Sequence, residues 1–213
     1  MSKVLVADFG TGNLHSVMTA IQVVSSGSEV EASRSARKIR MADRLILPGQ
    51  GAIGTWMSEL QDDEVRQAVN EALRTKPVLG ICLGLQALYE HSEEDGGVEG
   101  LKVLAGRVER FSAGLIDCGH RIKIPHMGWS KVHQTRQHPL WSGIPQDTRF
   151  YFVHSYFARS DRDSEVAAVA DYGLKFTCAA ARENLFAVQF HPEKSRQQGL
   201  RLLTNFLNWD GET

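Results

Sequence analysis

One cysteine in the chain has surroundings that suit covalent catalysis. Cys82 stands between Gly80 and Gly84, directly after a short apolar run, residues 78–81, that we expect to be a buried strand. An apolar segment of helical composition, residues 83–89, follows it. Strand, sharp turn and helix form the pattern of a nucleophile elbow, and the start of such a helix favours thiolate over thiol. A small buried core cysteine would also fit, so a partner base must decide.

A candidate base lies near the other end of the chain. His191 follows an alternating segment, residues 186–190, and Pro192 disfavours helical backbone at His191. Residues two apart on an extended chain point the same way, so we expect Glu193 to lie beside His191 and to fix its tautomer. With Cys82, these residues would make a triad of nucleophile, base and orienting carboxylate.

The composition excludes several classes of protein. The chain has 213 residues, of which 42% are hydrophobic and 23% charged, as in an ordinary globular domain, and we expect residues 1–213 to form one domain. A formal net charge of -1 gives no electrostatic case for nucleic acid, and no apolar run is long enough to cross a membrane. Three cysteines cannot all pair, which suits a reducing compartment, so we expect a cytoplasmic protein.

The order of apolar runs and helical segments predicts the fold class. In the first half, buried strands alternate with helices, with strands at residues 3–8, 29–32, 45–48 and 78–81, and helices at 13–24, 36–41 and 62–75. Asn13 is the expected cap of the first helix. After residue 101 we expect strands, partly antiparallel, at residues 107–111, 121–124, 129–133, 149–154, 165–170, 176–181 and 185–190. A last helix, about 196–209, is capped by Ser195. The prediction is an α/β fold with a mostly parallel central sheet, flanking helices and an antiparallel extension.

Two patterns that suggest bound groups are incomplete. Gly10 and Gly12 begin a dinucleotide fingerprint, but His15 stands where the third glycine belongs. The possible metal ligands have no usual ligand spacing; they are Cys118, His120, His126, His133 and His138. We therefore expect neither a metal nor another cofactor. Three glycines after strand 45–48 instead permit close approach of a ligand to the backbone.

The segments around the cysteine and the histidine resemble a known family. Residues 80–86, Gly-Ile-Cys-Leu-Gly-Leu-Gln, and 189–195, Gln-Phe-His-Pro-Glu-Lys-Ser, are similar to the class I, or triad, glutamine amidotransferases. In that family the cysteine attacks the side-chain amide of glutamine, ammonia leaves, and the glutamyl thioester is hydrolysed. The resemblance implies that Cys82 is the nucleophile, His191 the general base and acid, and Glu193 the orienting residue.

The resemblance also implies roles for neighbouring residues. The backbone N–H of Leu83 and that of Gln50 or Gly51 would donate hydrogen bonds to the oxyanion of the tetrahedral intermediate. Loss of one such donor typically lowers the rate by about 10²–10³. Glu94 would hold the α-ammonium of glutamine, although its acidic loop also suits plain solvated surface. The other residues implied to contact glutamine are Gly49, Gln86, Ser155 and Tyr156.

Residues 125–129 and 151–156 carry a narrower resemblance, which extends over nearly the whole chain. They are similar to the branch of the family whose members supply ammonia to imidazole glycerol phosphate synthases in histidine biosynthesis. Those glutaminases form heterodimers with a (β/α)8-barrel cyclase, and sealing against it keeps ammonia from water. The residues implied to face the cyclase are Asn13, Met127, Trp129, Tyr151 and Lys194. Core packing would also explain Trp129 and Tyr151, and Ser130 stands where the branch usually has asparagine.

Four other interpretations stay open at this stage. The chain could serve a different triad amidotransferase, such as those for pyridoxal phosphate or folate precursors, or a paralogous pathway with another acceptor. It could also be a relative that uses the fold only for interaction, which the intact triad argues against. A cysteine hydrolase acting on esters would leave Gln86 and Glu94 without a role.

Overall fold

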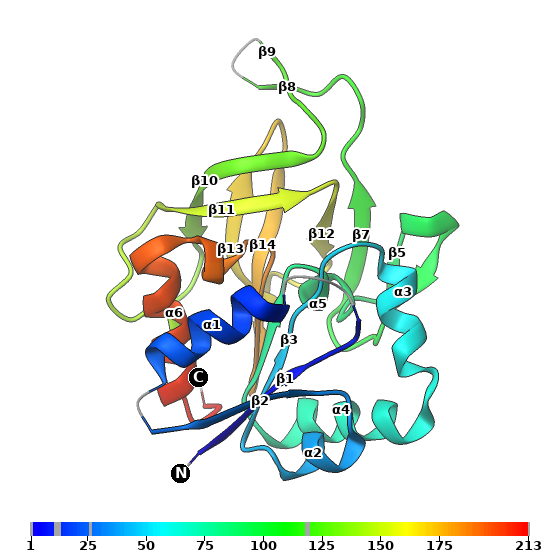
Figure 1. The fold of residues 1–213 in the computed structure, drawn as a ribbon. Helices are drawn as coiled ribbons and strands as arrows, with labels where there is room; N and C mark the ends of the chain where they lie inside the picture. Colours follow the sequence, from blue (N-terminus) through cyan, green and yellow to red (C-terminus); the bar gives the residue numbers. More distant parts are fainter. Residues whose placement is uncertain (1, 11–13, 26, 118–119, 213) are drawn as a thin grey trace.

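The computed structural model describes residues 2–10, 14–25, 27–117 and 120–212. Within them, thirteen strands form one sheet, of which ten follow the order β2-β1-β3-β4-β15-β14-β12-β7-β5-β6 (Figure 1). The other three branch from β14: β13 pairs with β14, β10 with β13, and β11 with β10. A separate hairpin, β8 (Ile116–Asp117) and β9 (His120–Arg121), projects from one end of the molecule (Figure 1). Asn13 and Cys118 lie outside the described residues.

Five neighbouring strands make the parallel half of the sheet. They are β2 (Glu29–Ser33), β1 (Lys3–Ala7), β3 (Arg44–Leu47), β4 (Val78–Ile81) and β15 (Leu185–Val188). Helices α1 (Leu14–Val24) and α6 (Arg196–Asn208) pack on one face, and α2 (Ala36–Met41) and α4 (Asp63–Thr75) on the other (Figure 1). Because both faces are covered, β1, β3, β4 and β15 are apolar runs, whereas the edge strand β2 alternates and is only half-buried.

The remaining strands form the antiparallel extension. Strand β14 (Lys175–Arg182) pairs antiparallel with β15, β12 and β13, and β10 pairs antiparallel with β11 and β13. The bounds of the other strands are β5 (His91–Ser92), β6 (Val98–Glu99), β7 (Gly106–Arg110), β10 (His126–Gln134), β11 (Thr148–His154), β12 (Tyr156–Ser160) and β13 (Val166–Asp171). The predicted fold class is confirmed.

Several predicted elements differ from the observed ones. The helix after Cys82, α5 (Leu83–Gln86), is only one turn long, because the carbonyls of residues 87–90 accept hydrogen bonds from the backbone of residues 100–104. The predicted strand 121–124 is wrong, since only Arg121 of it is in a strand. Helix α3 (Ile53–Ser58) was not predicted.

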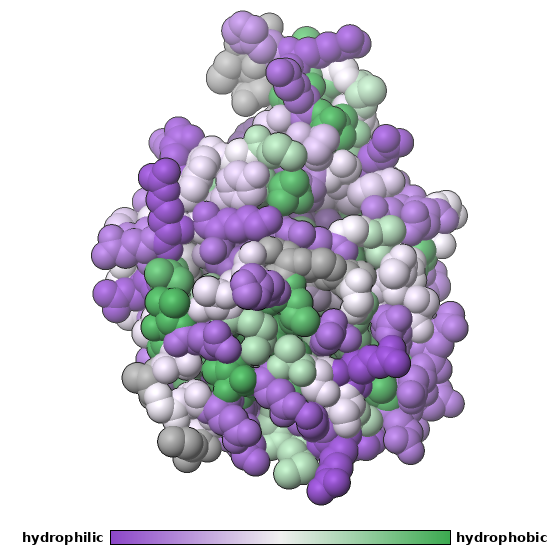
Figure 2. All heavy atoms as spheres, in the orientation of Figure 1, coloured by the Kyte–Doolittle hydropathy of each residue, from purple (hydrophilic) through white to green (hydrophobic). Residues whose placement is uncertain are grey.

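Short 3-10 helices complete the structure. They are η1 (Glu59–Gln61), η2 (Glu94–Gly96), η3 (Pro139–Trp141), η4 (Asp163–Glu165) and η5 (Pro192–Lys194). None of the helices in the described ranges combines the length and apolar composition needed to cross a bilayer. The face shown in Figure 2 mixes small hydrophobic and hydrophilic areas.

The strand order determines which loops meet. Strand β4 lies between β3 and β15, all three parallel, so the segments after Leu47, Ile81 and Val188 emerge at the same edge. Ligand sites of open α/β sheets form at such carboxyl ends. Cys82 and His191 are therefore neighbours in space although they are far apart in the sequence.

Candidate active site

The turn at Cys82 has the strained backbone of a nucleophile elbow. Cys82 has φ 55° and ψ -104°, and its N–H donates to the carbonyl of Val188 at 2.7 Å. A Cβ on Gly84 would lie 1.8 Å from the carbonyl oxygen of Leu47, and one on Gly80 would lie 2.9 Å from the Cβ of Ala187. The flanking glycines thus let the elbow pack directly on β3 and β15. Such strain persists only where the surroundings hold it, as at reactive sites.

The candidate base has its carboxylate beside it, as expected. His191 Nδ1 lies 2.7 Å from Glu193 Oε1, and the two side chains are 1% and 0% exposed. The expected extended path is wrong: residues 192–194 form η5, and the 3-10 turn brings Glu193 back to His191. Burial alone would lower the pKa of His191, but nearby Cys82 and Glu193 raise it to about 10. These two neighbours therefore favour the protonated form of the imidazole.

A buried serine fixes the backbone of this histidine. Ser195 Oγ donates to the carbonyl of His191 at 2.6 Å and accepts from the N–H of Tyr151 at 3.0 Å. The N–H of His191 donates in turn to the carbonyl of Tyr151 at 2.9 Å. The side chain of Ser195 does not cap α6, contrary to the prediction, because it is occupied here. Strand β11 thereby positions the imidazole.

Two glutamine side chains lie behind the cysteine. Gln189 Nε2 donates to Cys82 Sγ at 3.5 Å, and Gln86 Nε2 donates to Gln189 Oε1 at 3.0 Å. Gln86 Nε2 also donates to the carbonyl of Tyr156 at 2.9 Å. Gln189 was not predicted as a site residue, although a glutamine directly after a buried apolar strand must find buried partners.

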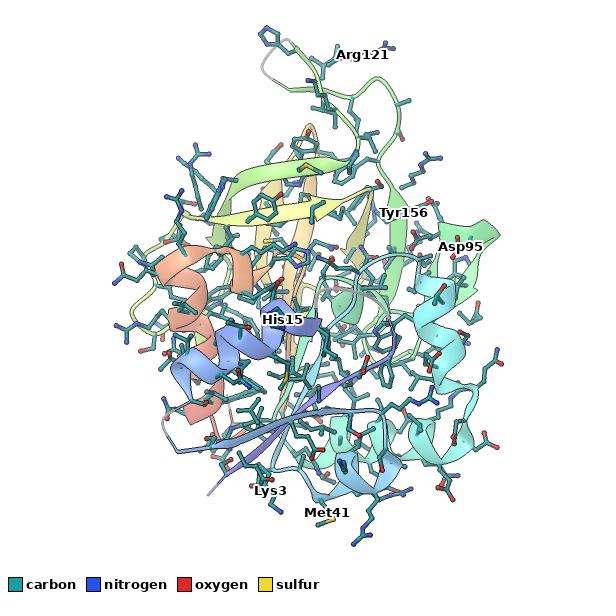
Figure 3. The ribbon with its side chains drawn as sticks, in the orientation of Figure 1. Lys3, His15, Met41, Asp95, Arg121 and Tyr156 are labelled. Atoms are coloured by element: carbon teal, nitrogen blue, oxygen red, sulfur yellow. The ribbon has the colours of Figure 1, made fainter. Side chains whose placement is uncertain are left out.

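A cavity of about 530 Å³ opens in front of Cys82. Most residues implied to bind glutamine or to face a cyclase contribute to its wall: Gln50, Gly51, Leu83, Gln86, Glu94, Met127, Tyr151, Ser155, Tyr156 and Lys194. Figure 3 shows Tyr156 and Asp95 on the same side of the molecule, with η2 close to α3. The structure therefore brings most of the sequence-predicted residues to one hollow.

Of the other predicted site residues, Gly49 and Trp129 lie outside this cavity, and Glu94 lies in its wall with a further contact. Gly49 does not line the cavity; its carbonyl accepts from the N–H of Leu83 at 3.4 Å, so that donor already has a partner. Glu94 lines the cavity and accepts from the N–H of Ile53, and burial raises the pKa of its carboxyl group. Trp129 lies outside the cavity and is 37% exposed.

The described residues include no group of three or more His, Cys, Asp or Glu side chains placed to hold a metal ion. His126 instead contacts His154 and Ser130, and His133 contacts Asp147. The chemistry available at the elbow is therefore that of a cysteine nucleophile with a histidine and a carboxylate behind it.

A cysteine on a strained elbow, a histidine–glutamate pair and a cavity in front of the sulfur suit acyl transfer from an amide. The model of the family described as Glutamine amidotransferase class-I matches residues 5–209. The chain belongs to the class-I glutamine amidotransferase family. Two curated relatives named imidazole glycerol phosphate synthase subunit HisH are each 51% identical over 211 residues. The one from Nitrosomonas europaea covers 98% of this chain and 99% of its own, and the one from Nitrosococcus oceani covers 99% of each.

Solved structures of this family share the fold. A putative GMP synthase protein from Thermoplasma acidophilum matches with a TM-score of 0.71 at 21% identity, covering 98% of this chain and 93% of its own. PurLQS from Thermotoga maritima also has a TM-score of 0.71, at 15% identity, covering 97% and 98%. At these identities the likeness concerns the fold alone.

Proposed function

We propose that this amidotransferase is the glutaminase subunit of an imidazole glycerol phosphate synthase, acting as one domain over residues 1–213. The observation that carries the glutaminase activity is the strained Cys82 elbow, facing a cavity, with the His191–Glu193 pair behind it. The two relatives that are 51% identical over their full length support histidine biosynthesis as the pathway that uses the released ammonia. Its location in the cytoplasm stays a prediction from the sequence.

The reaction follows from the charges at the elbow. The sulfur of Cys82 attacks the side-chain carbonyl carbon of glutamine, and a C–S bond forms while the carbonyl becomes an oxyanion. Imidazolium His191 gives its proton to the leaving nitrogen, and ammonia departs from the glutamyl thioester. His191 then takes a proton from water, which attacks the thioester and releases glutamate. Glu193 keeps the Nδ1 proton in place and stabilises the imidazolium in both steps.

The oxyanion needs two donors, of which one is occupied in this structure. The N–H of Leu83 donates to the carbonyl of Gly49, and Gly51 has a left-handed φ of 92° that permits a change of the loop. We infer that reorientation of residues 49–51 frees the Leu83 N–H and turns a second N–H, of Gln50 or Gly51, inward. Glutaminase activity then depends on whatever stabilises that loop arrangement.

The partner we propose is a (β/α)8-barrel cyclase that receives the ammonia. Met127 and Trp129, at 62% and 37%, are among the exposed large hydrophobic residues of β10, next to the mouth of the cavity. The guanidinium of Arg196 lies 5.3 Å from the centre of the Trp129 ring, and Tyr151 lies at 6.0 Å. Aromatic and arginine side chains of this kind anchor interfaces. These residues and Lys194 form the proposed docking face. Asn13, which the resemblance also assigns to it, lies outside the described residues.

Reconstitution tests the proposal. Glutamate release from glutamine is measured for wild type and Cys82→Ser, each alone and with the cyclase barrel and its ribulosyl phosphate ligand. We expect strong release only from wild type with the liganded barrel. Release that is equally strong without the barrel would retain a glutaminase but overturn the assignment to this synthase, in favour of another acceptor pathway. No release under any condition would overturn the activity itself.

A further inference from the structure

A continuous chain of buried and part-buried hydrogen bonds leads from the docking strand β10 to the nucleophile. It begins at Ser130, passes through two histidines, His126 and His154, and reaches the carbonyl of Tyr156. From that carbonyl it continues through the side-chain amides of Gln86 and Gln189 to Cys82 Sγ. The reaction as derived above uses neither histidine.

The direction of every bond in this chain is determined. A backbone carbonyl only accepts, so the Tyr156 oxygen receives one proton from Gln86 Nε2, at 2.9 Å, and one from His154 Nδ1, at 2.7 Å. His154 Nε2 is then the bare nitrogen and accepts from His126 Nδ1 at 2.9 Å. His126 Nε2 is bare in turn and accepts from Ser130 Oγ at 2.8 Å.

The two imidazoles are suited to keep these directions. His126 is 1% and His154 is 7% exposed, and His126 is stacked between the rings of Phe152 and Tyr172. Burial lowers the pKa of His126 to about 4 and that of His154 to about 3. Both rings are therefore neutral near pH 7. Each has one N–H that donates and one bare nitrogen that accepts, so every hydrogen bond of the chain pairs a donor with an acceptor.

The amide pair at the other end is fixed equally firmly. Gln189 is 0% and Gln86 is 4% exposed. Because Gln86 Nε2 donates to Gln189 Oε1, the amide of Gln189 must present its Nε2 to the sulfur. A donor so oriented stabilises a thiolate and limits where the sulfur can lie.

We propose that Gln189 and Gln86 position the sulfur of Cys82, and that the Ser130–His126–His154 relay transmits the position of β10 to this amide pair. The effect on the sulfur stands on the contacts alone. The consequence for docking rests on the proposed function, because Met127 and Trp129 of the same strand form the proposed docking face.

Alkylation of Cys82 by iodoacetamide in the free chain tests the effect on the sulfur without glutamine or a partner. The rate is followed by peptide mass spectrometry from pH 5 to 10 for wild type and Gln189→Leu. We expect Gln189→Leu to react about tenfold more slowly near pH 7, because one charge-assisted hydrogen bond to the sulfur is lost. Its rate-against-pH curve should be shifted to higher pH. A folded Gln189→Leu with the wild-type profile would overturn the positioning role.

A conservative pair tests the relay and stays informative even if Gln189→Leu does not fold. His126→Asn keeps an N–H donor near the place of Nδ1, whereas His126→Leu removes it. We expect a severalfold slower alkylation for His126→Leu and a rate close to wild type for His126→Asn. The matched control is His133→Leu on the same strand, whose side chain is 58% exposed and contacts Asp147, and it should leave the rate unchanged. Equal rates for both His126 variants would contradict the relay.

The docking consequence has its own readout. In the reconstituted synthase, Ser130→Ala should lower kcat for glutamate release with little change in KM, whereas His133→Leu, outside the relay on the same strand, should leave kcat unchanged. If the barrel does not stimulate the chain at all, the proposed function fails but the free-chain results still decide the positioning role. Stimulation of Ser130→Ala equal to that of wild type would overturn the link to β10.

Discussion

At the scale of single residues, the general acid is protonated before substrate arrives. Cys82 and Glu193 both raise the pKa of buried His191, so the proton needed by the leaving ammonia is already on the imidazole. What the resting site lacks is a free oxyanion donor at Leu83.

Ser195 gives a test of how tightly His191 must be held. In Ser195→Ala the hydroxyl that joins the His191 carbonyl to the Tyr151 N–H is absent, so the ring gains freedom. We expect kcat of the reconstituted synthase to fall about tenfold with KM nearly unchanged, because the cavity stays intact. Steady-state glutaminase kinetics measures both constants.

The control for this change lies on α6, the helix that directly follows Ser195. Thr204 Oγ1 donates to the carbonyl of Leu200 and contacts no residue of the site. Thr204→Ala should leave kcat within about twofold of wild type. A similar fall in both variants would mean that general loosening of α6, rather than the position of His191, explains the effect.

The sequence predicts the triad better than the network behind it. Cys82, His191 and Glu193 stand in motifs whose spacing has a chemical meaning, and their geometry agrees with it. Gln189 and the His126–His154 pair were missed because each contact joins residues that are distant in the chain. The general rule that buried polar groups are paired would have singled out Gln189, but not its partner.

At the scale of elements, the close contact of the elbow with β3 is a feature that glycine alone permits. A Cβ at position 84 would overlap the carbonyl oxygen of Leu47, which is backbone and cannot rotate away. We expect Gly84→Ala to lower the free energy of unfolding by roughly 3 kcal/mol or more, within the range of severe overpacking, and to abolish glutamate release. Urea unfolding and the glutaminase assay measure the two effects.

Gly10→Ala serves as the comparison for the glycine substitution. Gly10 has a positive φ of 66° but open space around its Cβ position, so it reports backbone strain without overlap. Gly10→Ala should lower the free energy of unfolding by only about 1–2 kcal/mol. Comparable losses for the two variants would show that α5 does not depend on close approach to β3.

Propensity and periodicity account for most elements but not for their ends. Strands β3, β4 and β15, whose carboxyl ends meet at the site, were predicted because short apolar runs are typical of buried parallel strands. The helix after Cys82 was predicted too long, since its later carbonyls bond to residues 100–104 instead of continuing the helix. Helix α3 was missed because Gly49, Gly51 and Gly54 indicate a loop. Tertiary contacts decide these cases.

At the scale of the whole molecule, buried histidines make stability depend on pH in opposite ways. Burial lowers the pKa of His126 and His138 to about 4 and that of His154 to about 3, from about 6.5 in the unfolded chain. As the pH falls from 6.5 towards 4, the unfolded chain binds protons that the folded chain refuses, so the free energy of unfolding decreases. His191, with its pKa raised to about 10, stabilises fully below pH 6.5 and loses its contribution as the pH rises towards 10.

Removing one buried histidine outside the cavity tests this dependence. We expect His138→Leu to lessen the acid-side slope by about 1.4 kcal/mol per pH unit, the contribution of one proton. Urea unfolding between pH 4.5 and 6.5 measures the slope. The exposed His133→Leu should retain the wild-type slope, and a His138→Leu slope equal to wild type would contradict the assignment.

The measurement that tests the identity of the nucleophile most directly is covalent labelling by a diazoketone analogue of glutamine. Such a reagent enters a glutamine pocket and alkylates the sulfur there. Peptide mass spectrometry should find the label on Cys82 alone, protectable by glutamine and absent from Cys82→Ser, with none on the fully buried Cys178. Labelling of another residue, or labelling that glutamine does not slow, would contradict the assignment of Cys82 and its cavity to glutamine hydrolysis.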